Sequence, residues 1–156
     1  MNGTVFGLSK DLFYMDQALN EARKALDNGE VPVGAVIVNP HGNIVATGYN
    51  VVESIHCQTG HAELQAIESA TKSIADWRLD WHWIYITLEP CAMCFGCISL
   101  SRFAGVVYAA SALEQSPLDM NHSSRLYNNS NFVIVSDIKA AESIALLQEF
   151  FQRKRK

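Results

Sequence analysis

Four residues in two short stretches have the types and spacing of a metal site with a proton shuttle beside it. His61 and Glu63 lie two residues apart in His-Ala-Glu, and Cys91 and Cys94 lie three apart in Glu-Pro-Cys-Ala-Met-Cys. Zinc binds imidazole and thiolate in tetrahedral geometry, and a catalytic zinc site keeps one position open for water. Three ligands, His61, Cys91 and Cys94, leave that position free, and the metal lowers the pKa of the water that fills it. Glu63 is then the candidate general acid and base, so the set predicts a hydrolytic active site.

The spacing also allows a site without catalysis. Pro-Cys-x-x-Cys is expected by chance roughly 0.003 times in a chain of this composition, so the match is informative. The alternative is a closed structural zinc with Cys57 or Cys97 as fourth ligand, or a pair of buried reduced thiols. Cys97 lies six residues beyond Cys91 on an expected helix, about 120° around its axis, which makes it a poor third thiolate.

Length and composition indicate one globular domain, residues 1–156, with a sizeable hydrophobic core. No apolar run approaches the length of a membrane span, and residues 1–10 lack a secretory signal, so we expect a cytoplasmic protein without a membrane partner. The net charge of −4 argues mildly against nucleic acid. Four basic residues nevertheless end the chain, Arg153 to Lys156, and such a tip can contact phosphate.

The hydrophobic pattern alternates between strands and helices. Strands are expected at 33–38, 44–49, 83–88, 105–110 and 132–136. Helices are expected from an N-cap at Ser9 to about residue 28, and over 61–73, 91–101 and 137–153, whereas residues 50–60 are expected to form a loop. This alternation predicts an α/β fold, a three-layer α/β/α sandwich.

The expected helix after residue 60 constrains how His61 and Glu63 meet. Its apolar stripe includes Glu63 together with Ala66, Ile67, Ala70 and Ile74, so this carboxylate is expected to be buried, which is costly without a partner. Residues 61 and 63 lie about 200° apart on a helix. His61 can therefore share a site with Glu63 only from the first helical position, directed past the helix end.

At the level of motifs, the chain resembles the cytidine deaminase superfamily and, within it, the bacterial tRNA-specific adenosine deaminases. The resemblance covers about residues 10–110 well and 131–156 loosely. It is carried by Glu30-Val31-Pro32-Val33-Gly34-Ala35-Val36, Gly48-Tyr49-Asn50, His61-Ala62-Glu63, Trp77-Arg78-Leu79, Thr87-Leu88-Glu89-Pro90-Cys91-Ala92-Met93-Cys94, Ser101-Arg102 and Phe150-Phe151.

The resemblance implies a five-stranded mixed sheet of order 2-1-3-4-5 and a homodimer. It further implies that His61, Cys91 and Cys94 hold one Zn²⁺ per chain, and that Glu63 moves a proton from water to departing ammonia as adenosine becomes inosine. Asn50 would hydrogen-bond the base, although spacing alone favours a turn residue at the end of a strand. The amide of Ala62 would face the reacting centre.

The sequence departs from those deaminases over residues 111–131, where their Asp-x-Lys-Thr-Gly stretch and further glycines are missing. Three functions therefore stay open. The chain is expected to deaminate adenosine at the wobble position of a tRNA anticodon stem-loop. The alternatives are a zinc-dependent deaminase of a free base or nucleoside, guanine or cytosine, and a non-catalytic zinc-stabilised interaction protein. The roles of His56, Cys57 and Cys97 are left open.

Overall fold

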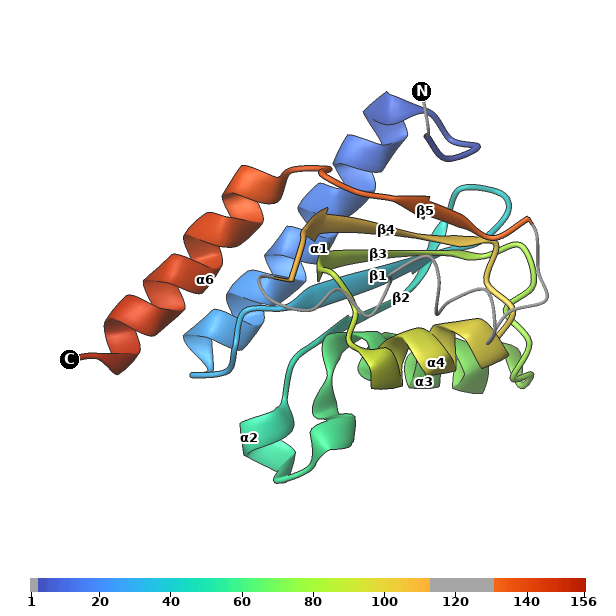
Figure 1. Ribbon diagram of the computed structural model, residues 1–156. Coiled ribbons are helices and arrows are strands. Elements are labelled where there is room, and N and C mark those ends of the chain that lie inside the picture. The colour runs from blue at the N-terminus through green and yellow to red at the C-terminus, as the bar shows by residue number, and fades with distance from the viewer. Residues whose placement is uncertain (1–2, 113–130) are drawn as a thin grey trace.

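The strands expected from the sequence form one mixed sheet in the computed structural model, which describes residues 3–112 and 131–156 (Figure 1). The strands are β1 (Gly34–Val38), β2 (Ile44–Tyr49), β3 (Trp83–Leu88), β4 (Gly105–Ala110) and β5 (Val133–Val135). Their order is β2-β1-β3-β4-β5. Strand β1 pairs antiparallel with β2 and β3, whereas β3, β4 and β5 run parallel. The predicted sheet and its order are confirmed.

Helices cover both faces of this sheet (Figure 1). They are α1 (Leu8–Asp27), α2 (Val52–Ile55), α3 (Ala62–Ile74), α4 (Ala92–Leu100) and α6 (Ala140–Lys154), with a 3-10 turn at Gln58–Gly60. One core lies between the sheet and α1 with α6, and a second lies between the sheet and α3 with α4. The arrangement is the predicted α/β/α sandwich.

The central strand β1 is buried along its whole length because it faces both cores. Val36 and Val38 point into the core under α1, and Ala35 and Ile37 point into the core under α3. On the neighbouring strand, a side-chain carbon at Gly48 would lie 2.5 Å from the carbonyl oxygen of Ala62. This glycine therefore lets the start of α3 lie directly against the sheet, and the candidate site begins there.

Three local predictions differ from the structure. The expected loop 50–60 contains α2 and the 3-10 turn. The last helix begins at Ala140 and not at Asp137, because Asp137 and Lys139 have left-handed backbone angles with φ of 64° and 60°. The first helix is capped by Gly7 without a side-chain hydrogen bond, so Ser9 is not its N-cap.

Most of the divergent segment 111–131 lies outside the described residues, so its predicted effect on substrate contact stays a prediction. Within residues 3–112 and 131–156, no helix is long and apolar enough to cross a membrane.

Candidate metal centre and active site

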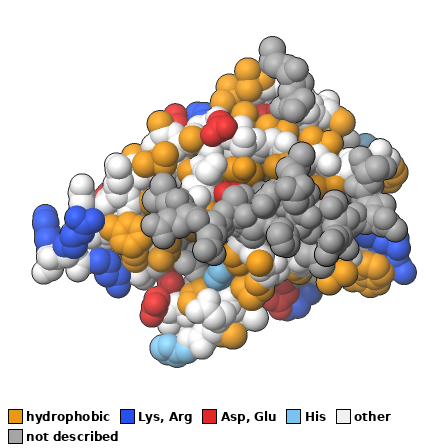
Figure 2. All heavy atoms as spheres, viewed as in Figure 1, with side chains coloured by type: hydrophobic (Ala, Val, Ile, Leu, Met, Phe, Trp, Pro, Cys, Tyr) orange, Lys and Arg blue, Asp and Glu red, His pale blue; other side chains and the backbone are white. Residues whose placement is uncertain are grey.

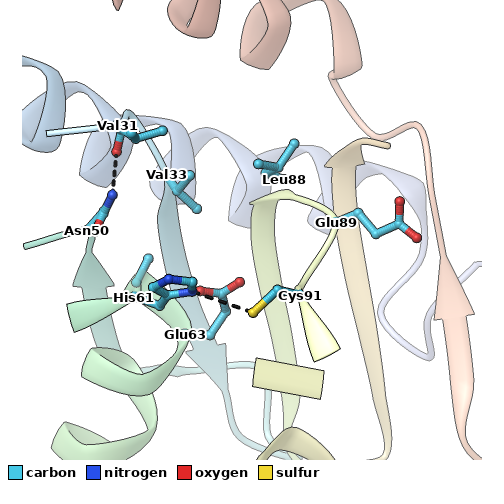
Figure 3. Close-up of a pocket in the computed structure, with 9 residues that line it drawn as sticks. Val31, Val33, Asn50, His61, Glu63, Leu88, Glu89 and Cys91 are labelled. Carbon is cyan, nitrogen blue, oxygen red and sulfur yellow. Dashed lines mark hydrogen bonds between the residues drawn. The ribbon is translucent and has the colours of Figure 1, made fainter. Parts of the chain in front are cut away.

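The starts of α3 and α4 bring the predicted metal ligands together (Figure 3). His61 is the N-cap of α3 and Cys91 is the N-cap of α4, both with extended backbone, and Cys94 lies in the first turn of α4. The Nδ1 atom of His61 is 3.6 Å from Sγ of Cys91 and 3.4 Å from Sγ of Cys94. His61 thus points past the end of its helix, as its spacing from Glu63 required.

These distances fit a tetrahedral zinc. Zn–S bonds of about 2.3 Å and Zn–N bonds of about 2.0 Å at the tetrahedral angle separate sulfur from nitrogen by about 3.5 Å. The two observed separations are 3.6 and 3.4 Å. Among the described residues, no fourth His, Cys, Asp or Glu joins the group, and Cys57 and Cys97 lie outside it. The geometry therefore favours three protein ligands and an open fourth position over a closed structural site.

The thiols of Cys91 and Cys94 and the imidazole of His61 shift one another's pKa values through hydrogen bonds. The pKa of Cys91 falls to about 3 because the thiol of Cys94 and the ring of His61 donate hydrogen bonds to its thiolate. The pKa of Cys94 is raised because its thiol is the donor to Cys91 and because it is buried. The hydrogen bond to Cys91 also raises the pKa of His61. Such a preformed thiolate–imidazole set is a soft ligand group for zinc, and binding releases its remaining protons.

Glu63 lies beside this group with almost no contact with solvent. Its exposed fraction is 4%, and Ala66, Ile67 and Ala70 of the predicted stripe are buried with it, whereas Ile74 at the end of the stripe is 43% exposed. Burial raises the pKa of Glu63, although its own backbone amide and the charge of His61 partly offset this. Figure 3 shows the carboxylate next to the imidazole and facing Cys91. A carboxylic acid whose charged form is destabilised by its site is suited to accept and return a proton.

A cavity of about 210 Å³ opens onto these side chains. It is smaller than the 300–1,000 Å³ typical of drug-sized ligands, which suits a single planar base. Its apolar walls include Val33 and Leu88, which lie above the imidazole in Figure 3. The lining residues are Val31, Val33, Asn50, His61, Ala62, Glu63, Leu88, Glu89 and Cys91.

Asn50 and Ala62, the other two predicted site residues, both line the cavity. The side chain of Asn50 donates from Nδ2 to the carbonyl oxygen of Val31 at 3.2 Å, and its Oδ1 accepts from the amide of Val52 at 3.1 Å. Asn50 is therefore both the turn residue that its spacing suggested and a wall of the cavity. Ala62 is fully buried as the first residue of α3, and the role of its amide stays a prediction.

The sequence argument did not identify all of the lining. Val31, Val33 and Leu88 carry no chemical signal, and only the course of the chain brings them to the cavity. Glu89 lines it too, but its carboxylate points away from His61 (Figure 3) and accepts a hydrogen bond from the amide of Ala112 at 2.8 Å. His56 is exposed and does not line the cavity.

The chain is similar to known proteins in sequence and in fold. The family model of the cytidine and deoxycytidylate deaminase zinc-binding region matches residues 8–110. The tRNA-specific adenosine deaminase of Bacillus subtilis (strain 168) is 36% identical over 153 residues, 96% of this chain and 93% of that protein.

Two solved structures are similar as well. One, from a study of A-to-I editing by tRNA:A34 deaminases at the wobble position of transfer RNA, superposes with a TM-score of 0.79 and 31% identity, covering 86% of this chain and 99% of that one. A guanine deaminase from Bacillus subtilis superposes with a TM-score of 0.61 and 33% identity, over 72% of this chain and 67% of that one.

Proposed function

The chain belongs to the cytidine and deoxycytidylate deaminase family, and from this we propose that it is a zinc-dependent hydrolase that converts adenosine to inosine at the wobble position of a tRNA anticodon loop. The observation that carries the proposal is the buried carboxylate of Glu63 beside a three-ligand metal group. A structural zinc has no use for a buried carboxylate at an open metal position, so the non-catalytic alternative is not favoured.

We propose that His61, Cys91 and Cys94 hold one zinc ion per chain. When bound, the zinc would lower the pKa of a water molecule at the site. Glu63 would take a proton from the attacking water and pass it to N1 of the adenine as the oxygen bonds to C6 and the C6–N1 double bond becomes single. It would then carry the proton of the new hydroxyl to the exocyclic nitrogen as the bond between C6 and that nitrogen breaks and the C6 carbonyl forms. Ammonia leaves and inosine remains. The low exposure of Glu63 keeps bulk water from intercepting that proton.

We propose that Asn50 recognises the base. An amide side chain has two N–H donors and two lone pairs on its oxygen. The bonds to Val31 and Val52 use one of each, so one N–H and one lone pair remain for the edge of an adenine in the cavity. Val33 and Leu88 supply apolar surface for the faces of the base.

The basic tip of the chain supports an RNA substrate. Arg153, Lys154, Arg155 and Lys156 are all exposed. Figure 2 shows Lys and Arg side chains gathered over the C-terminal end of α6, and Figure 1 places this end on the side of the molecule where α2 lies. The positive charge of Lys154 contributes to lowering the pKa of Glu30, the residue that precedes Val31 of the cavity wall. We propose that these side chains hold phosphates of the stem-loop while its base occupies the cavity.

We also propose a homodimer, and the surface of α4 supports it. This helix contains no charged residue, yet Met93 and Leu100 are 42% and 78% exposed on one stripe with Gly96 between them. A helix that is apolar all round is normally covered. Leu100→Glu should therefore shift the sedimentation of the protein toward that of the monomer, and Val5→Glu, at a site 79% exposed away from α4, should not. An unchanged sedimentation coefficient for Leu100→Glu would contradict this interface.

Residues 1–156 are proposed to form a single deaminase domain that works in the cytoplasm, where its tRNA substrate is found. The decisive experiment incubates the zinc-loaded protein with an anticodon stem-loop carrying adenosine at the wobble position and, in parallel, with free guanine, cytosine and adenine. Inosine in the stem-loop, with the free bases unchanged, is the expected result. Ammonia from a free base with the stem-loop unchanged would instead support the free-base alternative, to which the Bacillus subtilis guanine deaminase gives a structural parallel.

A further inference from the structure

A second buried carboxylate, that of Glu30, lies outside the catalytic group. Glu30 is 1% exposed and lies three residues after the end of α1 at Asp27, where its amide donates to the carbonyl oxygen of Ala25 at 2.9 Å. Gly29, with φ of 75°, makes the turn that places it there. Glu30 is therefore held rigidly at the position from which the chain enters the cavity wall at Val31.

The carboxylate of Glu30 holds the segment that contains α2. Its Oε2 accepts from the amide of Glu53 at 3.0 Å, and its Oε1 accepts from both the amide and the hydroxyl of Ser54 at 2.7 Å. Burial alone would raise the pKa of Glu30, but these three donors and the charge of Lys154 lower it below the ordinary value. The group is thus a carboxylate at neutral pH and accepts all three hydrogen bonds.

The residues next to this clamp hold the side chain of Asn50. Val31, which follows Glu30, accepts from Nδ2 of Asn50, and Val52, which precedes Glu53, donates to Oδ1. The Asn50 amide is therefore gripped on both sides by backbone groups that the Glu30 carboxylate draws together. Among the described residues, these two hydrogen bonds determine which way round the Asn50 amide lies. They therefore determine whether its nitrogen or its oxygen faces a given edge of a bound base.

We propose that Glu30 is a positioning residue for base recognition, which orients the Asn50 amide by drawing α2 against residues 30–31. The inference rests on the proposed deaminase function. A site built to hydrogen-bond one base edge rejects bases that present a different pattern, provided that the amide cannot rotate. Glu30 touches neither the base nor the metal group, so its effect on the reaction passes through Asn50.

The test uses Glu30→Gln, which keeps the shape of the side chain but turns one acceptor into a donor that faces another donor. We expect kcat/KM for the wobble-adenosine stem-loop to fall about tenfold to a hundredfold, with zinc content unchanged. The matched control is Asp11→Asn. Asp11 is also 1% exposed and bound by side chains, those of Thr4 and Tyr85, but it lies roughly 24 Å away along α1. This control should lower the melting temperature and leave kcat/KM within about twofold at a temperature where it is folded.

A double-mutant cycle separates positioning from a general loss of structure. If Glu30 acts through Asn50, Glu30→Gln should have less than about a threefold effect in the Asn50→Ala background. The inference would be overturned if the losses of kcat/KM caused by Glu30→Gln and Asn50→Ala simply multiply in the double mutant. It would also be overturned if Asn50→Ala alone is as active as the wild type. Ser54→Ala removes one of the three hydrogen bonds to Glu30, and it is the variant to use if Glu30→Gln does not fold. It should lower kcat/KM in the same direction by a smaller factor, and a Ser54→Ala protein identical to the wild type would count against the clamp.

A measurement without substrate distinguishes failure of this inference from failure of the proposed function. In hydrogen exchange on the zinc-loaded protein, Glu30→Gln should remove protection from amides within residues 50–57 and leave those of α3 and the sheet unchanged. Unchanged exchange in that segment would refute the clamp even if the wild type edits RNA. A wild-type protein that does not form inosine, with the exchange pattern altered as expected, would refute the substrate and leave the clamp supported.

Discussion

Replacing Glu63 with glutamine tests the proposed chemistry most directly, because the change keeps the side-chain shape and removes the ability to accept a proton. The site is 4% exposed, so a larger or smaller residue would leave a clash or a cavity, and glutamine avoids both. Burial raises the pKa of Glu63, so the charged form is destabilised in the folded protein. We therefore expect Glu63→Gln to bind zinc and to melt at or above the wild-type temperature.

The expected loss of activity follows from the two proton transfers assigned to one carboxylate. A single general acid–base step contributes about 10²–10⁴ in rate, which corresponds to about 2.7–5.4 kcal/mol of barrier. Because the same residue moves the proton from water to N1 and the hydroxyl proton to the leaving nitrogen, its replacement by glutamine removes both transfers. We expect kcat on the stem-loop to fall by about 10³ or more.

The assay measures inosine in the stem-loop under single-turnover conditions, with zinc determined by mass spectrometry and folding by thermal melting. Glu68→Gln is the matched control, since Glu68 lies on the same helix but is exposed and paired with Lys72 at 2.6 Å. It should behave as the wild type. A Glu63→Gln enzyme within tenfold of wild-type kcat, with zinc bound, would show that another residue moves the proton and would refute the assigned mechanism.

Three further predictions concern the metal, the RNA and pH. Purified protein should contain about one zinc per chain. Cys91→Ala should lose most of this zinc, and Cys97→Ala should keep it because the Cys97 sulfur lies outside the ligand group. A Cys91→Ala protein that still binds a full zinc would exclude Cys91 as a ligand. Affinity for the stem-loop should fall steeply as the salt concentration rises, and deletion of residues 153–156 should make this dependence less steep. If fluorescence-anisotropy titrations give the same salt dependence for the truncated and the full-length protein, residues 153–156 do not contact the RNA. The pKa of Glu30 is lowered in the folded state, so its stabilisation should be fully present above the ordinary value of about 4.5 and be lost as pH falls through the lower folded-state pKa. The difference in unfolding free energy between wild type and Glu30→Gln, from urea titrations, should accordingly be constant above about pH 6 and shrink below about pH 4.5, and a difference that grows with acid would contradict this sign.

Much of the fold follows from local pattern. The continuous apolar run in β1 and the helical stripe of α3 each have only one way to bury their side chains, so their positions and the layered architecture could be predicted. The start of the last helix, α6, could not be predicted from the local pattern. Left-handed backbone at Asp137 and Lys139 delays α6 to Ala140. Aspartate adopts this conformation more often than most residues, but lysine is not among the residues that favour it, so the apolar pattern alone does not locate the helix start.

The sequence by itself determined the chemistry of the site, because His61, Glu63, Cys91 and Cys94 are the residue types that a zinc-dependent proton transfer needs, at spacings that helix starts can bring together. Only the tertiary structure decided how the cavity is walled. Val31 and Leu88 line it although they lie far apart in the chain, and the start of α2 is held beside Val31 by contacts such as the hydrogen bond from Glu53 to Glu30, 23 residues earlier. Hydrogen bonds of this kind depend on where the sheet and α1 place two backbones in space, and no local sequence pattern encodes that distance.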